Sequence, residues 1–310
     1  MKLTVHPVPA MGAEDVVVTP DGDVFTGTED GTIWRLRPDG SRLDRVAHTG
    51  GRPLGLELLD SSLPFDGDLL VCDARRGLLV VDTGSGTVTT LTERVDGTRM
   101  RFCNNAAVGG DGTIWFSDSS THYGIERWKD DFVQVTRTGR LLRRDVDGTV
   151  TVVERGLAFA NGVALSAFGD FVAVAESGAR TVVRHWLTGE RAGRRDFLVE
   201  DLPGYPDNIS RGSDGLIWVS IGSPTDPVVE RIQRAPMPVR RAVTRIPAPL
   251  QPKPKRTVRA QAYDDAGKLV HDLDISAPDF HMVTGVREHE GSVWLGSLHE
   301  AAVAVLPYTR

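Results

Sequence analysis

The sequence predicts an all-β fold, a six-bladed β-propeller made of four-stranded antiparallel blades. Two observations favour this fold over others: short runs rich in β-branched and aromatic residues alternate with Asp-Gly turns, and these turns recur at a nearly fixed spacing. A parallel α/β fold is disfavoured, because long amphipathic helical patterns do not alternate with the strands. We interpret residues 1–310 as a single domain, since all-β folds of this length often form one unit.

The first repeat shows the pattern. Residues 16–19, 24–28 and 32–36 are strand-like runs, and Asp21-Gly22 and Asp30-Gly31 separate them as hairpin turns. Comparable turns recur at positions 21, 66, 111, 168, 214 and 290. Several of these gaps are close to about 45 residues, the length of a four-stranded propeller blade. Six turns therefore predict six blades.

The ends of the chain are expected to complete one blade together. Only three evident strands follow Val283, so we expect Leu3-Thr4-Val5 to supply the fourth strand of the sixth blade and to remove the free sheet edges. Two segments interrupt the repeat, at about 121–138 in the third blade and about 225–256 in the fifth. Insertions in repeat proteins usually lie on one face and often border the binding site.

Composition limits the classes of function. The net charge of −6 and the lack of a long like-charge block argue against nucleic-acid binding, and the short basic run at 253–256 is interpreted as a solvated loop. No run approaches the ~18 apolar residues of a membrane span, and residues 1–10 lack a signal-peptide core, so a cytoplasmic protein is expected. Cys72 and Cys103 are too few for a disulfide framework and are expected to be buried free thiols.

Four blades place an acidic or amide residue at the same position. Seven residues before the turns lie Glu14, Asn104, Asn161 and Asp207, and Asn208 follows directly. In a propeller these positions surround the mouth of the central channel. Two carboxylates with several carboxamides suit Ca²⁺, which takes 6–8 oxygen ligands at about 2.3–2.6 Å. The alternative is that these side chains serve local turns through hydrogen bonds to the backbone.

Five motifs stand out along the chain: GRPLG at 51–55, RFCNN at 101–105, WFSDSS at 115–120, FANGVAL at 159–165 and LPGYPDNI at 202–209. In this order they resemble the strictosidine-synthase-like family, and in particular its adipocyte plasma membrane-associated type. This family belongs to a calcium-dependent six-bladed propeller superfamily with the gluconolactonase/SMP-30 and paraoxonase proteins. The resemblance implies that Glu14, Asn104, Asn161, Asp207 and Asn208 match the catalytic calcium ligands of the hydrolytic relatives.

The same resemblance limits the chemistry. Thr284 stands where strictosidine synthase carries its catalytic glutamate, which implies that this chain does not form strictosidine. Leu54 stands where paraoxonases carry a histidine, so their histidine dyad is not reproduced. Of the acidic residues that bind a second calcium ion in paraoxonases, Asp15 matches one but Asn105 replaces the other, which implies a weaker second site.

The leading hypothesis is a calcium-dependent hydrolase of lactones or activated aryl esters, with a small molecule as its substrate. The metal would polarise the carbonyl group, and Asp207 would activate a water molecule. Asp118, Glu176, His122 and His281 are secondary candidates for catalysis. Two alternatives remain open: a propeller that keeps its metal for structure and binds a small ligand or a protein partner, and an enzyme of specialised metabolism with another chemistry.

Overall fold

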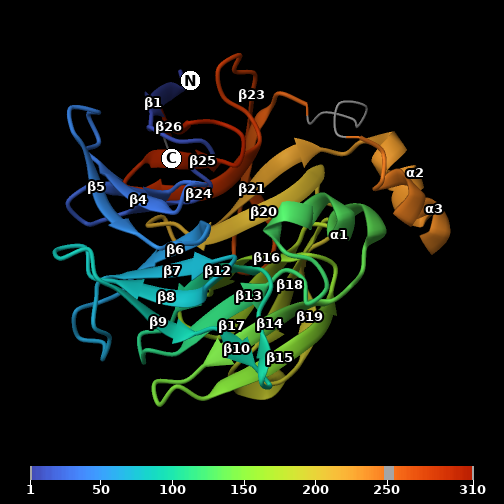
Figure 1. The fold of residues 1–310 in the computed structure, drawn as a ribbon, viewed down its shortest axis with the longest axis horizontal. Coiled ribbons are helices and arrows are strands. Elements are labelled where there is room, and N and C mark those ends of the chain that lie inside the picture. The colour runs from blue at the N-terminus through green and yellow to red at the C-terminus, as the bar shows by residue number, and fades with distance from the viewer. Residues whose placement is uncertain (1, 248–254, 309–310) are drawn as a thin grey trace.

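The computed structural model describes residues 2–247 and 255–308. Within these residues, six four-stranded antiparallel sheets are arranged as blades around a central axis, so the predicted six-bladed propeller is confirmed (Figure 1). A short hairpin, β10 (Arg94–Val95) and β11 (Thr98–Arg99), joins the second blade to the third. The first strand of each blade contacts the first strands of the neighbouring blades and so lies nearest the axis.

Each blade is a four-stranded meander. The first three blades consist of β2 (Val16–Val18), β3 (Val24–Gly27), β4 (Thr32–Leu36) and β5 (Leu43–His48); β6 (Pro53–Leu58), β7 (Leu69–Asp73), β8 (Gly77–Val81) and β9 (Val88–Thr92); and β12 (Cys103–Val108), β13 (Ile114–Asp118), β14 (Gly139–Arg144) and β15 (Val150–Leu157). The last three consist of β16 (Ala160–Leu165), β17 (Phe171–Glu176), β18 (Thr181–Trp186) and β19 (Arg195–Val199); β20 (Gly204–Arg211), β21 (Ile217–Pro224), β22 (Val258–Tyr263) and β23 (Leu269–Ile275); and β24 (Val283–His289), β25 (Ser292–Ser297), β26 (Ala302–Pro307) and β1 (Thr4–Pro7).

The sixth blade closes the ring as predicted. Strand β1 pairs antiparallel with β26, from Thr4 opposite Val305 to Pro7 opposite Ala302. The blue N-terminal strand and the red C-terminal strand therefore lie side by side in Figure 1. This pairing covers an edge that would otherwise expose unpaired backbone groups.

The six turns identified in the sequence all connect the first and second strands of a blade. The turns at 21, 66, 111, 168, 214 and 290 lie in the β2–β3, β6–β7, β12–β13, β16–β17, β20–β21 and β24–β25 connections. Gly22 and Gly215 have φ angles of 85° and 80°, a left-handed conformation that glycine adopts without the steric cost of a Cβ atom. The Asp-Gly pairs therefore marked the same hairpin in successive blades.

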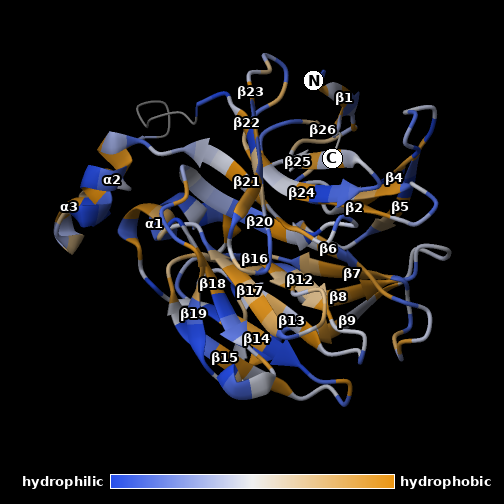
Figure 2. Ribbon diagram, turned by 180° about the vertical axis from the view of Figure 1, so that it is seen from behind, coloured by the Kyte–Doolittle hydropathy of each residue, from blue (hydrophilic) through white to orange (hydrophobic). Residues whose placement is uncertain are grey.

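The described residues form seven hydrophobic clusters, and six of these each lie between two neighbouring blades. Between the second and third blades, for example, Cys72 and Leu78 pack with Cys103 and Phe116. Both cysteines are buried free thiols, as predicted. Figure 2 shows the consequence for polarity: β17, which is buried throughout, is largely apolar, whereas the outer strands β15 and β19 mix hydrophilic and hydrophobic residues.

The two segments that interrupt the repeat carry the helices next to the central face. The 3-10 helix η1 (Ile125–Arg127) and helix α1 (Trp128–Gln134) lie between β13 and β14, and α2 (Pro227–Arg234) and α3 (Met237–Val243) lie between β21 and β22. A further 3-10 helix, η2 (Gly189–Arg191), lies in the β18–β19 connection. Part of the predicted segment 225–256, at 248–254, lies outside the described residues. Among the described helices, none has the length and apolarity that crossing a membrane requires.

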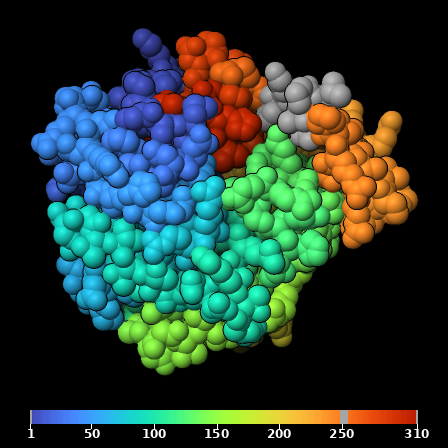
Figure 3. All heavy atoms as spheres, viewed as in Figure 1, coloured from blue at the N-terminus to red at the C-terminus, as the bar shows by residue number. Residues whose placement is uncertain are grey.

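The two insertions contact each other through hydrogen bonds. Gln134 Nε2 of α1 donates to Thr244 Oγ1, directly after α3, at 3.2 Å. Gln233 Nε2 of α2 donates to the carbonyl oxygen of Phe132 at 2.9 Å. Arg240 of α3 also donates to the carbonyl oxygen of Gln134. The three helices therefore form one cover, which extends beyond the rim of the propeller at α2 and α3 (Figure 3).

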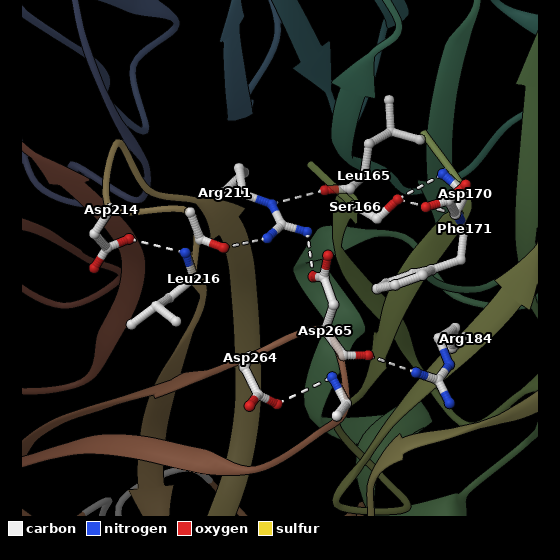
Figure 4. A network of polar contacts seen from close by, with 12 residues as sticks. Leu165, Ser166, Asp170, Phe171, Arg184, Arg211, Asp214, Leu216, Asp264 and Asp265 are labelled. Carbon is white, nitrogen blue, oxygen red and sulfur yellow. Dashed lines mark hydrogen bonds and ion pairs between the residues drawn. The ribbon is translucent and has the colours of Figure 1, made fainter. Parts of the chain in front are cut away.

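A second set of polar contacts joins blades four and five at the ends of the innermost strands that lie away from the helical cover (Figure 4). Arg211, at the end of β20, donates from Nε to the carbonyl oxygen of Leu165 at 3.0 Å and from a terminal nitrogen to Asp265 at 2.7 Å. Arg184 of blade four donates to the carbonyl oxygen of Asp265 at 2.7 Å. These contacts hold the two blades together far from the helical cover.

Candidate metal centre and pocket

Five of the six innermost strands contain the same irregularity. In each one the register of pairing with the second strand shifts, and two successive residues have no partner there, as between Cys103 and Ala106 in β12. The unpaired residues are Leu54-Gly55, Asn104-Asn105, Asn161-Gly162, Asp207-Asn208 and Thr284-Gly285. In the first blade, Glu14-Asp15 takes the corresponding place directly before β2. Such β-bulges redirect side chains, and here they repeat around the axis.

The second residue of each pair alternates between glycine and a polar side chain around the ring. Glycine is required where neighbouring blades approach closely: a Cβ atom on Gly162 would lie 2.0 Å from the backbone nitrogen of Ile209. A Cβ atom on Gly55 would lie 2.6 Å from the carbonyl oxygen of Asn104. The glycines therefore allow the innermost strands to pack tightly at the site.

Asp15 and Asn105 use their side chains to join blades. Asp15 Oδ2 accepts hydrogen bonds from the backbone nitrogen of Leu56 at 3.0 Å and from Asn105 Nδ2 at 3.3 Å. Asn105 Oδ1 accepts from the backbone nitrogen of Val163 at 2.8 Å. Because these oxygens are already engaged, the arrangement does not favour a second ion at the two residues.

The five residues predicted as metal ligands behave differently, because each carries a buried polar atom without a hydrogen-bond partner. Among the described residues these atoms are Glu14 Oε2, Asn104 Oδ1, Asn161 Oδ1, Asp207 Oδ1, and both Oδ1 and Nδ2 of Asn208. Folded proteins leave few buried polar groups unpaired, since each one costs about 1–3 kcal/mol. A set of them around one axis therefore indicates a site for a missing partner.

The two asparagine amides on the third and fourth blades are fixed by serines. Asn104 Nδ2 donates to Ser119 Oγ at 2.8 Å, and Asn161 Nδ2 donates to Ser177 Oγ at 3.1 Å. Ser177 Oγ in turn donates to the carbonyl oxygen of Pro206 at 2.6 Å. Because the amide nitrogens are engaged in this way, the amide oxygens are left as the unpaired groups. The sequence did not single out these serines, although each directly follows an acidic residue at the end of a second strand.

The two carboxylates of the centre are close enough to disfavour each other's ionisation. Burial raises the pKa of Glu14 well above its usual value, and the charges of Asp207 and Asp15 raise it further. Burial raises the pKa of Asp207 to about 7, against the opposing effect of the Asn161 amide. A bound cation would reverse this electrostatic cost.

The donor set fits a hard divalent cation. It consists of carboxylate and amide oxygens, the ligand types that Ca²⁺ takes, and its unpaired oxygens are the groups that an ion would satisfy. No group of three or more His, Cys, Asp or Glu residues suited to a metal occurs within 2–247 and 255–308, so no nitrogen- or sulfur-rich centre competes with it there.

A pocket of about 180 Å³ opens above the centre. Glu14, Asn104, Asn161 and Asp207 line it together, so the structure brings four of the five predicted ligands to one cavity. Its walls are otherwise mainly apolar. The blades contribute Leu54, Phe102, Phe159, Tyr205, Met282 and Leu298, and the helical cover contributes Ile125, Trp128, Phe132, Val133, Val229, Ile232 and Val243.

Aromatic rings connect the cover to the blades. Phe132 of α1 packs edge-on against Tyr205 of β20 with their ring centroids 4.8 Å apart. Phe102 and Phe159, at the start of two neighbouring blades, form a similar pair at 5.4 Å. These contacts join segments that are distant in the sequence, and sequence analysis did not identify them as one wall.

The secondary candidates do not line this pocket. Asp118 is buried in an ion pair with Arg140 and accepts a hydrogen bond from the backbone nitrogen of Phe102 at 3.0 Å. Glu176 accepts from the backbone nitrogen of Ala158 at 2.7 Å. His122 is exposed, and His281 pairs with Glu300.

Leu54 and Thr284 are the two positions at which the sequence lacks a catalytic group of the related enzymes. Leu54 is apolar, and the hydroxyl of Thr284 is already hydrogen-bonded. Leu54 is part of the pocket wall. Thr284 is fully buried, and its hydroxyl donates to the carbonyl oxygen of Glu14 at 2.7 Å. Neither residue offers a base to a substrate.

Comparison with known proteins identifies the family. Residues 29–249 match the family model described as the SMP-30/gluconolactonase/LRE-like region, and residues 6–36 match the strictosidine synthase-like N-terminal model. The chain belongs to the SMP-30/gluconolactonase family. It is also 31% identical to the protein strictosidine synthase-like 10 of Arabidopsis thaliana, over 93% of this chain and 83% of that protein. It is 31% identical to the adipocyte plasma membrane-associated protein of Gallus gallus, over 96% of this chain and 75% of that protein.

Solved structures of other proteins share the fold. A gluconolactonase from Xanthomonas campestris superposes with a TM-score of 0.70 at 16% identity, covering 99% of this chain and 89% of that one. Regucalcin, described as a calcium-binding protein from Agrobacterium tumefaciens, superposes with a TM-score of 0.66 at 14% identity, covering 98% and 95%. At these identities the likeness concerns the fold.

Proposed function

We propose that this family member is a calcium-dependent hydrolase of lactones or activated aryl esters. The observation that carries the proposal is the set of unpaired buried oxygens at the floor of an apolar pocket. Membership of the SMP-30/gluconolactonase family supports it, and a gluconolactonase and a protein described as calcium-binding share the fold.

Glu14, Asn104, Asn161, Asp207 and Asn208 would hold the ion. When bound, Ca²⁺ acts as a Lewis acid for a carbonyl oxygen and for the negative charge that develops on it during hydrolysis. The chain itself prepares the site: Ser119 and Ser177 orient two of the amides, and the glycines of the ring let the blades approach.

Asp207 is the proposed general base. Its carboxylate lines the pocket beside the other proposed ligands, where it can accept a hydrogen bond from a water molecule held near the substrate carbonyl. Asp207 would take a proton from water as the water oxygen bonds to the carbonyl carbon. The ester or ring C–O bond then breaks, and the departing oxygen takes up that proton, which returns Asp207 to its ionised form.

The walls of the pocket favour substrates with an apolar or aromatic group. Trp128, Phe132, Phe159 and Tyr205 offer aromatic surface that gains free energy from burying apolar area, about 25 cal/mol per Å². A polyhydroxylated sugar lactone would instead lose hydrogen bonds to water against these walls. We therefore propose aryl esters and alkyl-substituted lactones ahead of sugar lactones.

A second candidate function follows from Leu54 and Thr284. Neither supplies a reactive group, and Glu14 and Asp207 are the two carboxylates that the ring contributes to the pocket. The other charged residues of its lining, Lys129, Asp130, Asp226 and Lys255, come from the two insertions. A propeller that keeps its metal for structure and binds a small ligand without turnover is consistent with this arrangement.

The test compares hydrolysis with metal binding in the same protein. Aryl acetates, γ- and δ-lactones and gluconolactone are assayed with Ca²⁺ and with EDTA, in the wild type and in Asp207→Asn. We expect Ca²⁺-dependent hydrolysis in the wild type and a loss of at least about 100-fold in the variant. Asp147→Asn makes the same chemical change in an exposed turn and should retain full activity.

The outcomes separate the two candidates. Stabilisation by Ca²⁺ without hydrolysis of any substrate would favour the non-catalytic candidate. Hydrolysis that is equal in the wild type and Asp207→Asn would remove Asp207 from the mechanism.

A further inference from the structure

The outward side of the α2–α3 insertion has an unusual composition. Within residues 227–247 the exposed positions are occupied only by arginine, proline and aliphatic residues: Pro227, Val228, Arg231, Arg234, Pro236, Pro238, Val239, Arg241, Ala242, Arg245, Ile246 and Pro247. We call this set the cationic face. A helix face that meets only water normally carries acidic and neutral polar residues as well. The cationic face carries neither, and Figure 2 shows hydrophilic and hydrophobic residues side by side on both helices.

Most arginines of the cationic face form no ion pair with the described residues. Arg231, Arg241 and Arg245 form no ion pair with any other described residue, and Arg234 reaches Glu230 at 3.5 Å. Glu230 also pairs with Arg180 of blade four, at 3.3 Å. The positive charge of the face is therefore available to an outside partner.

The charge of the insertion is opposite to that of the whole protein. Residues 225–256 contain eight basic and two acidic residues, whereas the complete chain has a net charge of −6. An anionic partner would therefore be favoured at this basic segment of a chain that is acidic on balance. Such a distribution favours one orientation of approach.

Large apolar side chains lie among the arginines. Val228 is 57% exposed and Val239 is 47% exposed. Their exposure is not a result of a loosely held segment, because the opposite side of the helices is fixed against α1 by the Gln233 and Arg240 hydrogen bonds and packs Ile232 into the pocket wall.

We propose that the cationic face docks on an anionic lipid bilayer, with Val228 and Val239 entering the interface and the arginines contacting lipid phosphates. Basic side chains combined with exposed apolar ones are the features of helices that lie in the membrane interface. A purely polyanionic partner such as nucleic acid would gain nothing from the valines. A second copy of this chain, docked through the same face, would place the arginines opposite one another and repel. The proposal does not depend on hydrolysis.

The experiment measures co-sedimentation of the full chain with vesicles. Vesicles of phosphatidylcholine alone are compared with vesicles that also contain phosphatidylglycerol, over a series of salt concentrations. We expect binding only to the anionic vesicles, and we expect it to weaken as salt rises. Arg231→Gln/Arg241→Gln should bind about 30-fold more weakly, since each basic residue near the surface contributes about 1 kcal/mol.

Matched variants make the test specific. Val228→Ser/Val239→Ser keeps every charge and should also lower binding, whereas Arg45→Gln/Arg194→Gln removes two exposed arginines from the outer parts of blades one and four and should bind like the wild type. Failure of the wild type to bind anionic vesicles would overturn the proposal. So would equal losses in both arginine pairs, or full binding by the valine variant, which is the result expected for a polyanionic partner.

Discussion

Replacing Asp207 by asparagine should stabilise the metal-free protein at neutral and alkaline pH. The two side chains have nearly the same shape, but only aspartate can ionise. In the absence of metal, burial raises the pKa of Asp207 from 3.8 to about 7, so the ionised form is disfavoured in the folded state. The variant removes that cost and keeps the packing.

The sign and the size follow from the two pKa values. The folded state binds the proton more tightly than the unfolded state, so this stabilising contribution is complete below pH 3.8 and is lost as the pH rises through about 7. With about 1.4 kcal/mol for each pKa unit, the variant should exceed the wild type by under about 1 kcal/mol at pH 4 and by about 4 kcal/mol at pH 8. For a chain of this size that is on the order of 5–10 °C in melting temperature.

The assay is thermal melting of both proteins in EDTA from pH 4 to pH 8, followed by the same series with Ca²⁺. A ligand that binds only the folded state stabilises it by about 2.7 kcal/mol at 100 times its dissociation constant, so we expect Ca²⁺ to stabilise the wild type. The variant, with one carboxylate fewer, should gain less. We therefore expect the advantage of Asp207→Asn at pH 8 to shrink or reverse when Ca²⁺ is added.

A metal-free variant that melts below the wild type at pH 8 would contradict this expectation. A difference between the two proteins that does not change with pH would contradict it as well. Either result would mean that other groups of the protein stabilise the ionised Asp207 carboxylate, so that it does not require a bound cation.

Three further predictions concern other parts of the molecule. Phe132→Ala should raise KM for aryl acetates by about 10-fold and leave KM for gluconolactone unchanged, because it removes apolar pocket surface; equal changes for both substrates would contradict the proposed pocket. Arg140→Met should lower the free energy of unfolding by about 3–5 kcal/mol in urea titrations, because it leaves Asp118 buried and unpaired; a loss below about 1 kcal/mol would show that Asp118 is compensated elsewhere. Arg211→Ala should cost about 1–3 kcal/mol in the same titration without changing Ca²⁺ binding, since it separates blades four and five at the far ends of their strands; a change in Ca²⁺ affinity would contradict that separation.

The fold was largely predictable because each blade repeats one local signal. The Asp-Gly turns lie at the same hairpin in successive blades, so their spacing gave both the number of blades and the alignment that brought Glu14, Asn104, Asn161 and Asp207 together. Blade two does not follow the offset, because a longer connection at 59–68 separates its first strand from its second. The place of Leu54 in the ring was visible only through the family resemblance.

The rest of the site could not be predicted from local patterns. The pocket wall joins Phe132 in one insertion with Tyr205 in another blade, and contacts between such distant segments leave no periodic signal in the sequence. The serines that orient the amides are common residues, and their role depends on the register between two strands. The alternation of glycine and polar residues around the ring is explained only by the close packing of neighbouring blades, as the approach of Ile209 to Gly162 shows.

A crystal structure of the wild type grown with Ca²⁺ would show whether the innermost strands hold the ion. We expect one ion on the axis, bound by oxygens of Glu14, Asn104, Asn161, Asp207 and Asn208 at about 2.3–2.6 Å, with solvent completing 6–8 ligands. Anomalous scattering would identify the ion. A map in which these five side chains hydrogen-bond to one another or to water, with no ion between them, would contradict it.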